Sequence, residues 1–508
     1  MTNKKSKNKH VKKILVANRG EIALRVMKSA KEMGISTVAI YSEADRMSPH
    51  VIYADEAVYI GPSPSSQSYL LGDKIIEICK ALGVDGIHPG YGFLSENSDF
   101  ARKVKNNGIT LIGPSPEAMD IMGDKISSKL AVKNFGTPLV PGTEEAISDI
   151  GEAKKIAAEI GYPIIIKASA GGGGKGMRVV QNEDEFEEQM NRAMSEARNA
   201  FGNDACFIEK YVTNPRHIEV QVLGDNYGNY VYVFERECSI QRRHQKVVEE
   251  APSSILTPEI REKIGEAAIN AARSCNYSNA GTVEFILDDK LNFYFLEMNT
   301  RLQVEHPVSE MISGLDLVKE QIKIARGEKL SIEQSDLKIQ GHALELRVYA
   351  EDPQNNFLPD IGRLEVYQKP EGMGIRVDDG FREGMDIPIY YDPMIAKLVV
   401  HGANRTEAID KMKRAIREFK IKGVKTTLDF GLFVLNHPAF VSGQFDTGFV
   451  DKFYKPEMLN IQLSSDQKET INGFLSIFGD KILMEKSGSA DKTMHSKQKS
   501  TSLWKKNR

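Results

Sequence analysis

The stretch "IIIKASAGGGGKGMRVV", residues 164–180, places four consecutive glycines between two lysines, with apolar, β-branched residues on each side. Gly171, Gly173 and Gly176 formally match GxGxxG. A dinucleotide-binding loop is followed by a helix, however, whereas "MRVVQNEDE" predicts a strand. A Walker A loop also fails, because Met177 stands where a lysine should follow the last glycine. The pattern therefore predicts a β-hairpin with the glycines at its tip.

This glycine hairpin has two possible roles. Glycines lack a Cβ atom, so their backbone N–H groups can approach phosphate oxygens closely, and such a loop can move as a lid. Lys167 and Lys175 flank the glycines and would add positive charge. On this stretch alone, a phosphate-binding flap and a purely structural hairpin both remain open.

The segments around the hairpin predict a mixed fold. Strands alternate with helices up to about residue 121, which is typical of an α/β layer with a mostly parallel sheet. Its first loop, "ANRGEIA", lacks GxGxxG, so a dinucleotide site there is weakly supported. From about residue 122 to 340, helices are followed by pairs of adjacent strands, which indicates α+β structure. A third segment carries short strands and one amphipathic helix, "NRTEAIDKMKRAIREF".

A second hairpin, "GTVEFILDDKLNFYFLEMNTR", contains two acids that we expect to face each other. If Lys290 and Leu291 form the centre of the turn, Glu284 lies directly opposite Glu297. At ~4 Å and an effective dielectric near ~20, two like charges repel by ~4 kcal/mol. A magnesium ion would neutralise them, and Asn299 lies on the same face. A solvent-facing charged hairpin is the alternative.

The stretch "CSIQRRHQKVVEEAP" gathers Arg242, Arg243, His244 and Lys246 within five residues. A nucleic-acid patch is disfavoured because the formal net charge of the chain is −3. A solvated charged face and an anion pocket, in which Lys246 binds a small anion, both remain open.

Other features of the sequence concern location. The cysteines, Cys79, Cys206, Cys238 and Cys275, form no CxxC pair, which favours reduced thiols. The start, "MTNKKSKNKH", does not resemble a secretory signal, and no apolar run approaches the ~20 residues of a membrane span. We therefore expect a cytoplasmic protein that binds neither membrane nor nucleic acid.

Beyond residue 458 the chain is rich in Ser and Lys, which predicts a disordered basic tail. This tail is either a solvated extension or a segment that docks a partner.

Together these segments resemble the biotin carboxylase family of the ATP-grasp superfamily. The resemblance spans about residues 12–456 and rests on these strings in family order: "ILVANRGEIALRV", "DGIHPGYGFLSEN", "MGDK", "IIIKASAGGGGKGM", "ECSIQRRHQKVVEEAP", "FLEMNTRLQVEHPVSEMI", "AEDP" and "YYDPMIAKL". It implies an N-terminal Rossmann-like domain (1–121), an ATP-grasp domain (122–340) with a mobile lid (about 140–212), a C-terminal β-rich domain (341–456) and an extension (457–508).

The resemblance also implies site residues. Those matching ATP contacts are Lys125, Lys167, Gly173, Gly174, Glu209, Lys210, Tyr211, Val212, His217, Gln241, His244, Glu284 and Glu297. Those matching metal ligands are Glu284, Glu297 and Asn299. Those matching the bicarbonate pocket are Lys246, Arg301, Gln303, Val304 and Glu305. Arg347 matches the arginine that meets the biotin ureido oxygen, and it joins Lys246, Arg301 and Glu305 as catalytic residues.

The implied activity is carboxylation of biotin via carboxyphosphate, using ATP, bicarbonate and magnesium or manganese. It is the first half-reaction of an acetyl-CoA, propionyl-CoA or pyruvate carboxylase. No "AMKM"-type biotin-attachment lysine is present, so biotin should be carried by a separate carrier protein. The expected partners are that carrier, a second copy of the chain and a carboxyltransferase subunit. A carbamoyl-phosphate-type ligase is the alternative. A non-catalytic nucleotide-binding protein is disfavoured by the intact catalytic set.

Overall fold

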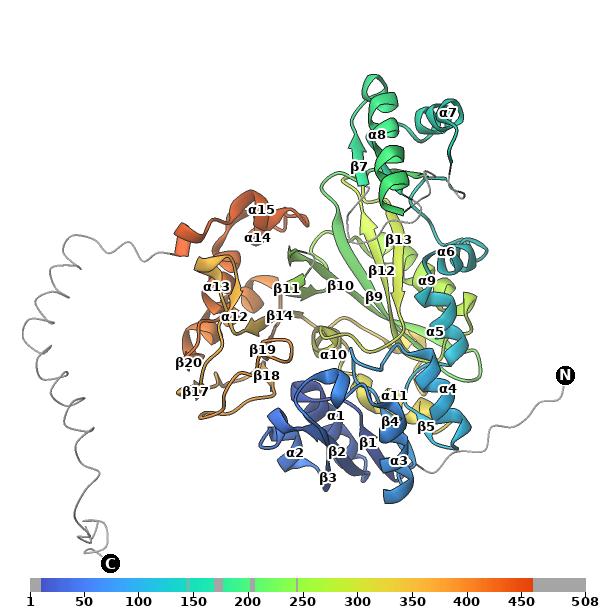
Figure 1. Ribbon diagram of the computed structural model, residues 1–508. Coiled ribbons are helices and arrows are strands. Elements are labelled where there is room, and N and C mark those ends of the chain that lie inside the picture. The colour runs from blue at the N-terminus through green and yellow to red at the C-terminus, as the bar shows by residue number, and fades with distance from the viewer. Residues whose placement is uncertain are drawn as a thin grey trace, which may run out of the picture. The chain divides into compact units, whose positions relative to one another are not determined.

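The structure is a computed structural model that describes residues 11–143, 145, 147–168, 177–201, 206–243 and 245–459 (Figure 1). Contacts divide the chain into a unit spanning Met1–Pro456 and a second unit from Glu457 onward. Everything below belongs to the first unit. The expected disordered tail lies outside the described residues, apart from the short turn Pro456–Leu459.

The N-terminal part is a parallel sheet with helices on both faces. Its strands, in the spatial order β3-β2-β1-β4-β5, are β1 (Lys13–Val16), β2 (Ser36–Ser42), β3 (Glu56–Gly61), β4 (Gly86–His88) and β5 (Thr110–Leu111). Its helices are α1 (Gly20–Glu32), α2 (Pro49–Tyr53), α3 (Gly72–Leu82), α4 (Ser98–Asn106) and α5 (Pro116–Gly123). The apolar run of β1 is buried on both faces: Ile14 packs in the cluster of α1, and Leu15 in the cluster of α3. The predicted parallel α/β layer is confirmed.

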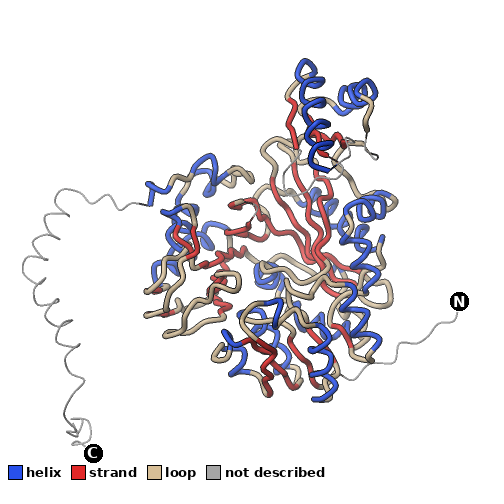
Figure 2. Tube along the Cα trace, in the orientation of Figure 1, coloured by secondary structure: helices blue, strands red, loops and turns tan. Residues whose placement is uncertain are grey.

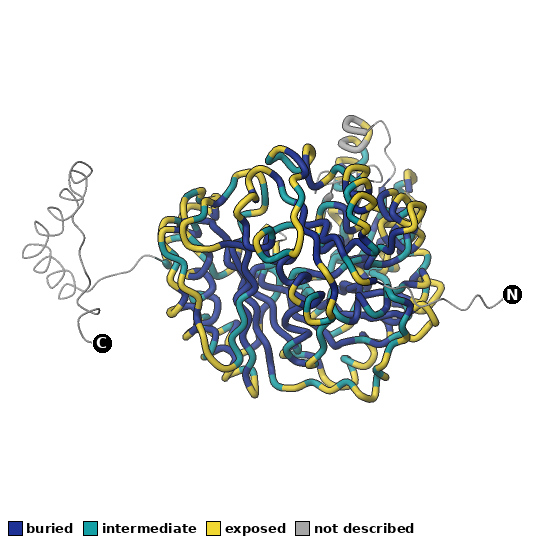
Figure 3. The backbone as a smooth tube through the Cα atoms, turned by 90° about the horizontal axis from the view of Figure 1, so that it is seen from below, coloured by how far each residue is buried: buried dark blue, intermediate teal, exposed yellow. Residues whose placement is uncertain are grey.

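A large antiparallel sheet forms the centre of the molecule. In the order β13-β12-β9-β10-β11-β14-β19-β18, its strands are β9 (Arg216–Gly224), β10 (Tyr230–Arg242), β11 (Gln245–Ala251), β12 (Asn279–Leu287), β13 (Phe293–Asn299), β14 (His342–Tyr349), β18 (Ile375–Asp379) and β19 (Met394–Gly402). The predicted hairpins β9–β10 and β12–β13 are present. The helices α9 (Pro258–Ser274), α10 (His306–Ser313) and α11 (Leu317–Ala325) accompany this sheet, whose inner strands are largely buried (Figure 3).

The predicted glycine hairpin is part of a small subdomain, which is the segment expected to act as a lid and is called the lid below. Its sheet, in the order β7-β6-β8, contains β6 (Ile164–Ala168), β7 (Met177–Val180) and β8 (Cys206–Lys210). The helices α7 (Ile150–Ile160) and α8 (Glu183–Phe201) lie beside these strands (Figure 2), and α6 (Lys125–Lys133) precedes them in the chain. The two strands of the predicted hairpin are present and Lys167 pairs with Met177, although residues 169–176, which include the glycines, lie outside the described residues. The strand is shorter than "MRVVQNEDE", because α8 begins at Glu183.

The C-terminal part contains more helix than predicted. The amphipathic helix is α12 (Arg405–Glu418), but α13 (Leu428–Asn436), α14 (Pro438–Val441) and α15 (Phe449–Phe453) follow it. Its short strands are β15 (Glu351–Asp352), β16 (Leu358–Pro359), β17 (Val366–Gln368) and β20 (Lys420–Lys422). The sequence of α13, "LDFGLFVLN", is apolar on nearly every side and so has no amphipathic period. None of the described helices combines the length and apolarity needed to cross a membrane.

Candidate active site

A cavity of about 850 Å³ collects most of the predicted site. The predicted residues that line it are His217, Gln241, Lys246, Glu284, Glu297, Asn299, Arg301, Gln303, Val304, Glu305 and Arg347. They come from six strands of the large sheet and from the turn that precedes α10. The N-terminal part supplies one wall of this cavity, including Arg19 and Tyr91.

The two acids of the second hairpin face each other, as predicted. Glu284 pairs with Glu297 across β12 and β13. The turn is centred on Lys290 and not between Lys290 and Leu291, because the Asp288 N–H donates to the Asn292 carbonyl. The register shift between Glu284 and Phe285 then restores the predicted pairing. This shift is a β-bulge in β13, and it leaves Leu296 and Glu297 both exposed beside the cavity.

These acids suit a divalent cation. Desolvation by the surrounding protein and the neighbouring Glu284 carboxylate raise the pKa of Glu297, and they outweigh the opposing effects of His217 and Lys246. The oxygens of two carboxylates and an amide are ligands that Mg²⁺ accepts. The Asn299 amide group donates from Nδ2 to Glu284 at 2.8 Å and accepts from Arg301 at Oδ1 at 3.0 Å. It must therefore rotate before its oxygen faces the acids.

Lys246 lies between three buried or nearly buried carboxylates. Its Nζ is 2.7 Å from Glu305 and 3.1 Å from Glu284, and it also contacts Glu219. Burial opposes the charged form, but these acids outweigh burial and raise the pKa of Lys246 well above its ordinary value. Burial would also raise the pKa of Glu305, yet Lys246 and Arg347 hold it well below its usual range. Both groups are therefore ionised at neutral pH.

Sequence reasoning missed Glu219, which is fully buried on β9. The guanidinium of Arg236 also contacts it, so Glu219 joins two cations beneath the cavity. A signal was present, because His217, Glu219 and Gln221 alternate with apolar residues and therefore share one face of the strand. His217 Nε2 lies 2.7 Å from Glu284 on that face.

Arg301 is oriented by neighbours on two sides. Its Nε donates to Glu96 at 2.8 Å, and one terminal nitrogen donates to the Gln303 side chain at 3.0 Å. Gln303 in turn donates to Glu284 at 3.2 Å. Glu96 is separated from Arg301 by 205 residues, and no local pattern in the sequence connects them.

Arg347 reaches the cavity from β14. It donates from Nε to Glu249 at 2.6 Å and from a terminal nitrogen to Glu305 at 2.9 Å. Burial raises the pKa of Glu249 to about 7, against the opposing effect of the Arg347 charge. Glu305 is thus shared by Lys246 and Arg347, one on each carboxylate oxygen.

Of the other predicted ATP contacts, those that the structure describes do not line this cavity. Lys125 is exposed and opens α6, whose N-cap Asp124 accepts from Ser127. Lys167 lies 2.5 Å from Glu209, which also binds Lys129 at 2.7 Å. The segment 209–212 begins within β8 and extends past its end. Lys210 Nζ donates to the Gly161 and Tyr162 carbonyls, and the Tyr211 N–H donates to the Pro163 carbonyl. Val212 is half-buried, and Gly173, Gly174 and His244 lie outside the described residues.

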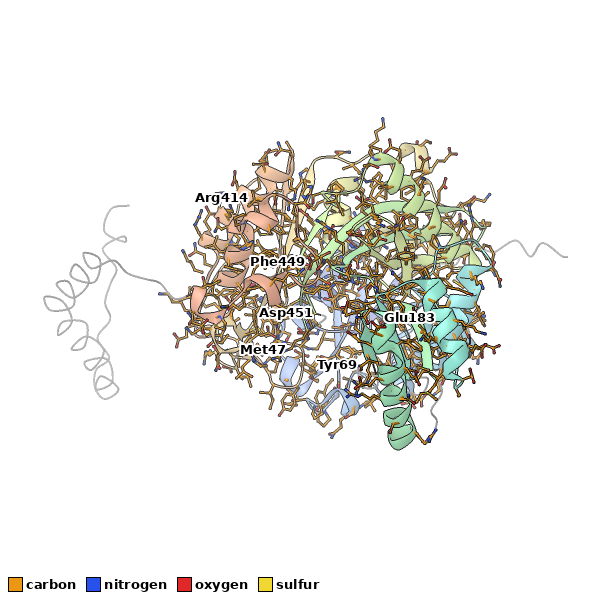
Figure 4. The ribbon with its side chains drawn as sticks, turned by 90° about the horizontal axis from the view of Figure 1, so that it is seen from above. Met47, Tyr69, Glu183, Arg414, Phe449 and Asp451 are labelled. Atoms are coloured by element: carbon orange, nitrogen blue, oxygen red, sulfur yellow. The ribbon has the colours of Figure 1, made fainter. Side chains whose placement is uncertain are left out.

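The N-terminal wall of the cavity is held by buried polar contacts. Arg19 forms two hydrogen bonds with Asp45, both at 2.7 Å, and stacks over Tyr391 at 4.0 Å. Tyr69, labelled in Figure 4, donates to the same aspartate at 2.6 Å. Tyr391 also lines the cavity, so this cluster connects the N-terminal part to the loop before β19.

Models of three protein families match successive parts of the chain. They are the biotin carboxylase N-terminal domain over residues 10–119, the carbamoyl-phosphate synthase L chain ATP-binding domain over 124–333, and the biotin carboxylase C-terminal domain over 345–452. The first and third matches favour a carboxylase over the carbamoyl-phosphate-type ligase.

Whole-chain comparisons agree with these matches. A pyruvate carboxylase subunit of Methanothermobacter thermautotrophicus is 53% identical over 441 residues, which cover 87% of this chain and 90% of that protein. Biotin carboxylase 1 of Bacillus subtilis is 51% identical over 444 residues, covering 87% of this chain and 99% of that protein. The biotin carboxylase domain of a thermophilic 2-oxoglutarate carboxylase, solved bound to bicarbonate, has a TM-score of 0.84 at 47% identity and covers 88% of this chain and 99% of that one.

A second solved structure of a 2-oxoglutarate carboxylase biotin carboxylase domain, from Hydrogenobacter thermophilus, is a dimer in complex with MgADP, ADP and bicarbonate. It has a TM-score of 0.79 at 48% identity and covers 89% of this chain and 99% of that one. The two relatives and the two structures each cover 87–89% of this chain. The chain belongs to the biotin carboxylase family of ATP-dependent carboxylases.

Proposed function

We propose that this chain catalyses the ATP- and bicarbonate-dependent carboxylation of biotin held on a separate carrier protein, through carboxyphosphate. The observation that carries the proposal is the sharing of Glu305 between Lys246 and Arg347 on one cavity. Lys246 is assigned to the bicarbonate step and Arg347 to the biotin step. The Glu305 carboxylate therefore contacts one residue of each step.

The first step activates bicarbonate. Lys246 and Arg301 would hold the anion through charge-assisted hydrogen bonds, with Gln303 and Val304 completing the pocket. Glu305, which is ionised because of its cationic neighbours, takes the bicarbonate proton as general base, a contribution of ~10²–10⁴-fold. The freed oxygen attacks the γ-phosphorus of ATP, so that ADP leaves and carboxyphosphate forms.

Nucleotide binding would use groups from the lid and the large sheet. Lys125, Lys167 and the glycines 173 and 174 are proposed for the phosphates, with His217, Gln241 and His244 nearby and residues 209–212 for the adenine. Glu284, Glu297 and Asn299 would hold magnesium, which neutralises negative charge on the phosphates when bound. Lys167 would then exchange its Glu209 partner for a phosphate.

The second step carboxylates biotin. Carboxyphosphate splits into carbon dioxide and phosphate, and the phosphate removes the proton from biotin N1. Arg347 would stabilise the negative charge that develops on the ureido oxygen, a contribution of about 3 kcal/mol. N1 then forms its bond to carbon dioxide. Closure of the lid would exclude water, which otherwise hydrolyses carboxyphosphate.

The organisation of the chain is part of the proposal. We assign residues 1–121, 122–340 and 341–456 to the three domains, with a lid at about 140–212. The proposed partners are a biotin carboxyl carrier protein, a second copy of the chain and a carboxyltransferase subunit. The dimeric state of the Hydrogenobacter thermophilus domain supports the second of these.

The test uses purified protein with magnesium, ATP and labelled bicarbonate, with and without free biotin. The expected result is ADP release that requires bicarbonate, and labelled carboxybiotin when biotin is added. No bicarbonate-dependent ADP release would contradict the proposal.

The variant Arg347→Ala separates the two steps. Loss of a charge-stabilising donor should lower carboxybiotin formation by ~10²–10³-fold. ATP cleavage without biotin should fall much less, because Lys246 and Arg301 remain, and it reports that the variant is folded. Equal losses in both assays would contradict the role assigned to Arg347.

A further inference from the structure

The stretch "YYDPMIAKL", residues 390–398, contributes to the family resemblance but has no role in the steps above. It begins in the loop before β19 and ends within that strand. Its lysine, Lys397, is completely buried, and long cationic side chains are almost never buried unless they are paired. The partners of this lysine therefore indicate what it does.

Lys397 lies directly beside the catalytic cavity. On β19 it pairs with Arg347 of β14 on one side and with Asp378 of β18 on the other. Its Nζ donates to the Val304 carbonyl at 3.0 Å and lies 3.1 Å from Glu21 and 3.9 Å from Asp378. One ammonium group thus contacts the turn before α10, the helix α1 and the strand β18.

The contact with Val304 fixes the backbone that carries the proposed general base. A peptide group is planar, so holding the Val304 carbonyl also holds the N–H of Glu305, the residue that caps α10. The preceding carbonyl, that of Gln303, lies 2.8 Å from Nδ1 of His306. The carbonyls of Gln303 and Val304, in the turn proposed to bind bicarbonate, are therefore each fixed by a buried side chain.

The contact with Glu21 reaches the opposite wall of the cavity. Glu21 accepts a hydrogen bond from the Tyr91 hydroxyl, and both residues line the cavity. The Lys397 ammonium also lies 6.0 Å from the centre of the Tyr91 ring. Without this cation, Glu21 would be a buried carboxylate whose oxygen Oε2 has no hydrogen-bond donor among the described residues.

We propose that Lys397 is a positioning residue for bicarbonate activation, because it fixes the Val304–Glu305 peptide against the N-terminal wall of the cavity. The inference rests on the proposed function and deepens it. In this proposal Lys397 contacts neither bicarbonate nor biotin. It acts through the orientation of Val304 and Glu305.

The test compares Lys397→Met with the double variant Glu21→Gln/Lys397→Met, measured as bicarbonate-dependent ADP release. Loss of one charged hydrogen bond to the turn should raise the KM for bicarbonate about tenfold, while the KM for ATP stays at the wild-type value. The double variant removes the unpaired acid, so its melting temperature should return toward wild type while its KM for bicarbonate stays high. Lys369→Met, which removes an exposed lysine from the same part of the chain, is the control and should match wild type.

The outcomes separate the two proposals. If the double variant recovers both the melting temperature and the KM for bicarbonate, Lys397 only neutralises Glu21, and the inference is wrong. If Lys397→Met has the wild-type KM for bicarbonate, the inference is also wrong, although the proposed function stands. If wild-type protein releases no ADP with bicarbonate, the proposed function itself fails.

Discussion

Most carboxylates of the site contact a cationic side chain. The exception is Glu297, which lies at the exposed edge of the cavity. Glu284, Glu219 and Glu305 each contact Lys246, whereas Glu297 has no cationic partner among the described ion pairs. Its pKa is raised by desolvation and by Glu284. We infer that Glu297 is the acid most dependent on magnesium.

The variant Glu297→Gln tests this inference. Removing one negative charge from the metal site should raise the magnesium concentration at half-maximal ADP release about tenfold, or about 1.4 kcal/mol. Because the substitution also removes repulsion with Glu284, the melting temperature without magnesium should not fall. Asp289→Asn, at the exposed tip of the same hairpin, is the matched control. An unchanged magnesium titration would count against Glu297 as a ligand.

Buried His88 should make the stability of the protein sensitive to acid. The side chain of His88 on β4 is fully buried, and its Nε2 lies 3.1 Å from Gln321. Burial lowers its pKa from 6.5 to about 4. Between these pH values His88 binds a proton in the unfolded state but not in the folded state. The free energy of unfolding is therefore unaffected by His88 above pH 6.5 and falls as the pH decreases toward 4.

The size of this effect follows from the width of the pH window. At about 1.36 kcal/mol for each pH unit, His88 should account for about 3 kcal/mol of the stability lost on acidification. In His88→Gln, unfolding by urea between about pH 4.5 and 7.5 should show a correspondingly flatter dependence on pH, whatever the absolute stability of the variant. If the two slopes are equal, His88 titrates alike in the folded and unfolded states.

Sequence reasoning predicted many of the residues that line the cavity, but few of the contacts that orient them. The alternation of side chains along a strand was enough to place Glu284, Glu297 and Asn299 on one face. The same rule could have found Glu219. It could not find Glu96 or Glu249, because their partners Arg301 and Arg347 lie 205 and 98 residues away and are reached only through the fold.

At the scale of secondary-structure elements, strand pairs were easier to predict than the details of each strand. The hairpins β6–β7, β9–β10 and β12–β13 follow from apolar runs separated by turn residues. The bulge in β13 was not predicted, because one extra residue leaves no pattern in the sequence. Helix α13 was missed because it packs apolar residues against β14 and α12 and has no polar face.

The lid has a hydrophobic core of its own. Phe186 of α8 is fully buried in a cluster with Ile166, Val180 and Ile208, and none of the described residues in this cluster belongs to the large sheet. The lid should therefore lose structure without unfolding the rest of the chain.

The variant Phe186→Ala tests the independence of the lid. The cavity should cost the lid about 3–5 kcal/mol. Amide exchange should become faster in the lid elements alone, which are β6, β7, β8, α7 and α8, and the KM for ATP should rise while the main melting transition stays in place. Phe186→Leu should give a smaller change in the same direction. Faster exchange throughout the large sheet would show that lid and body unfold together.

On the scale of the whole molecule, one sheet crosses the boundary proposed at residue 340. Strand β11 pairs with β14, so Glu249 and Arg347 meet through a contact between two segments that the sequence assigns to different domains. Local patterns predict which strands exist, but pairing between distant strands depends on the packing of the entire chain. This is why the fold class was predicted correctly while the continuity of the sheet was not.

The residues after Leu459 lie outside the described part of the chain, and their role can be tested by removing them. The last family model that matches the chain ends at residue 452, so the residues after Leu459 lie beyond every matched family domain. We expect a chain shortened to residues 1–459 to keep the wild-type kcat for free biotin. Labelled bicarbonate incorporation would measure this, and a large loss would place part of the catalytic apparatus in the tail.

A comparison with the biotinylated carrier as substrate distinguishes the two roles left open for the tail. A solvated extension predicts an equal KM for the carrier in full-length and shortened chains. A docking tail predicts a higher KM for the carrier in the shortened chain, with kcat and the KM for free biotin unchanged, because docking adds binding energy away from the reacting atoms. If that increase disappears in high salt, the interaction is electrostatic, as the lysine-rich residues 485–508 predict.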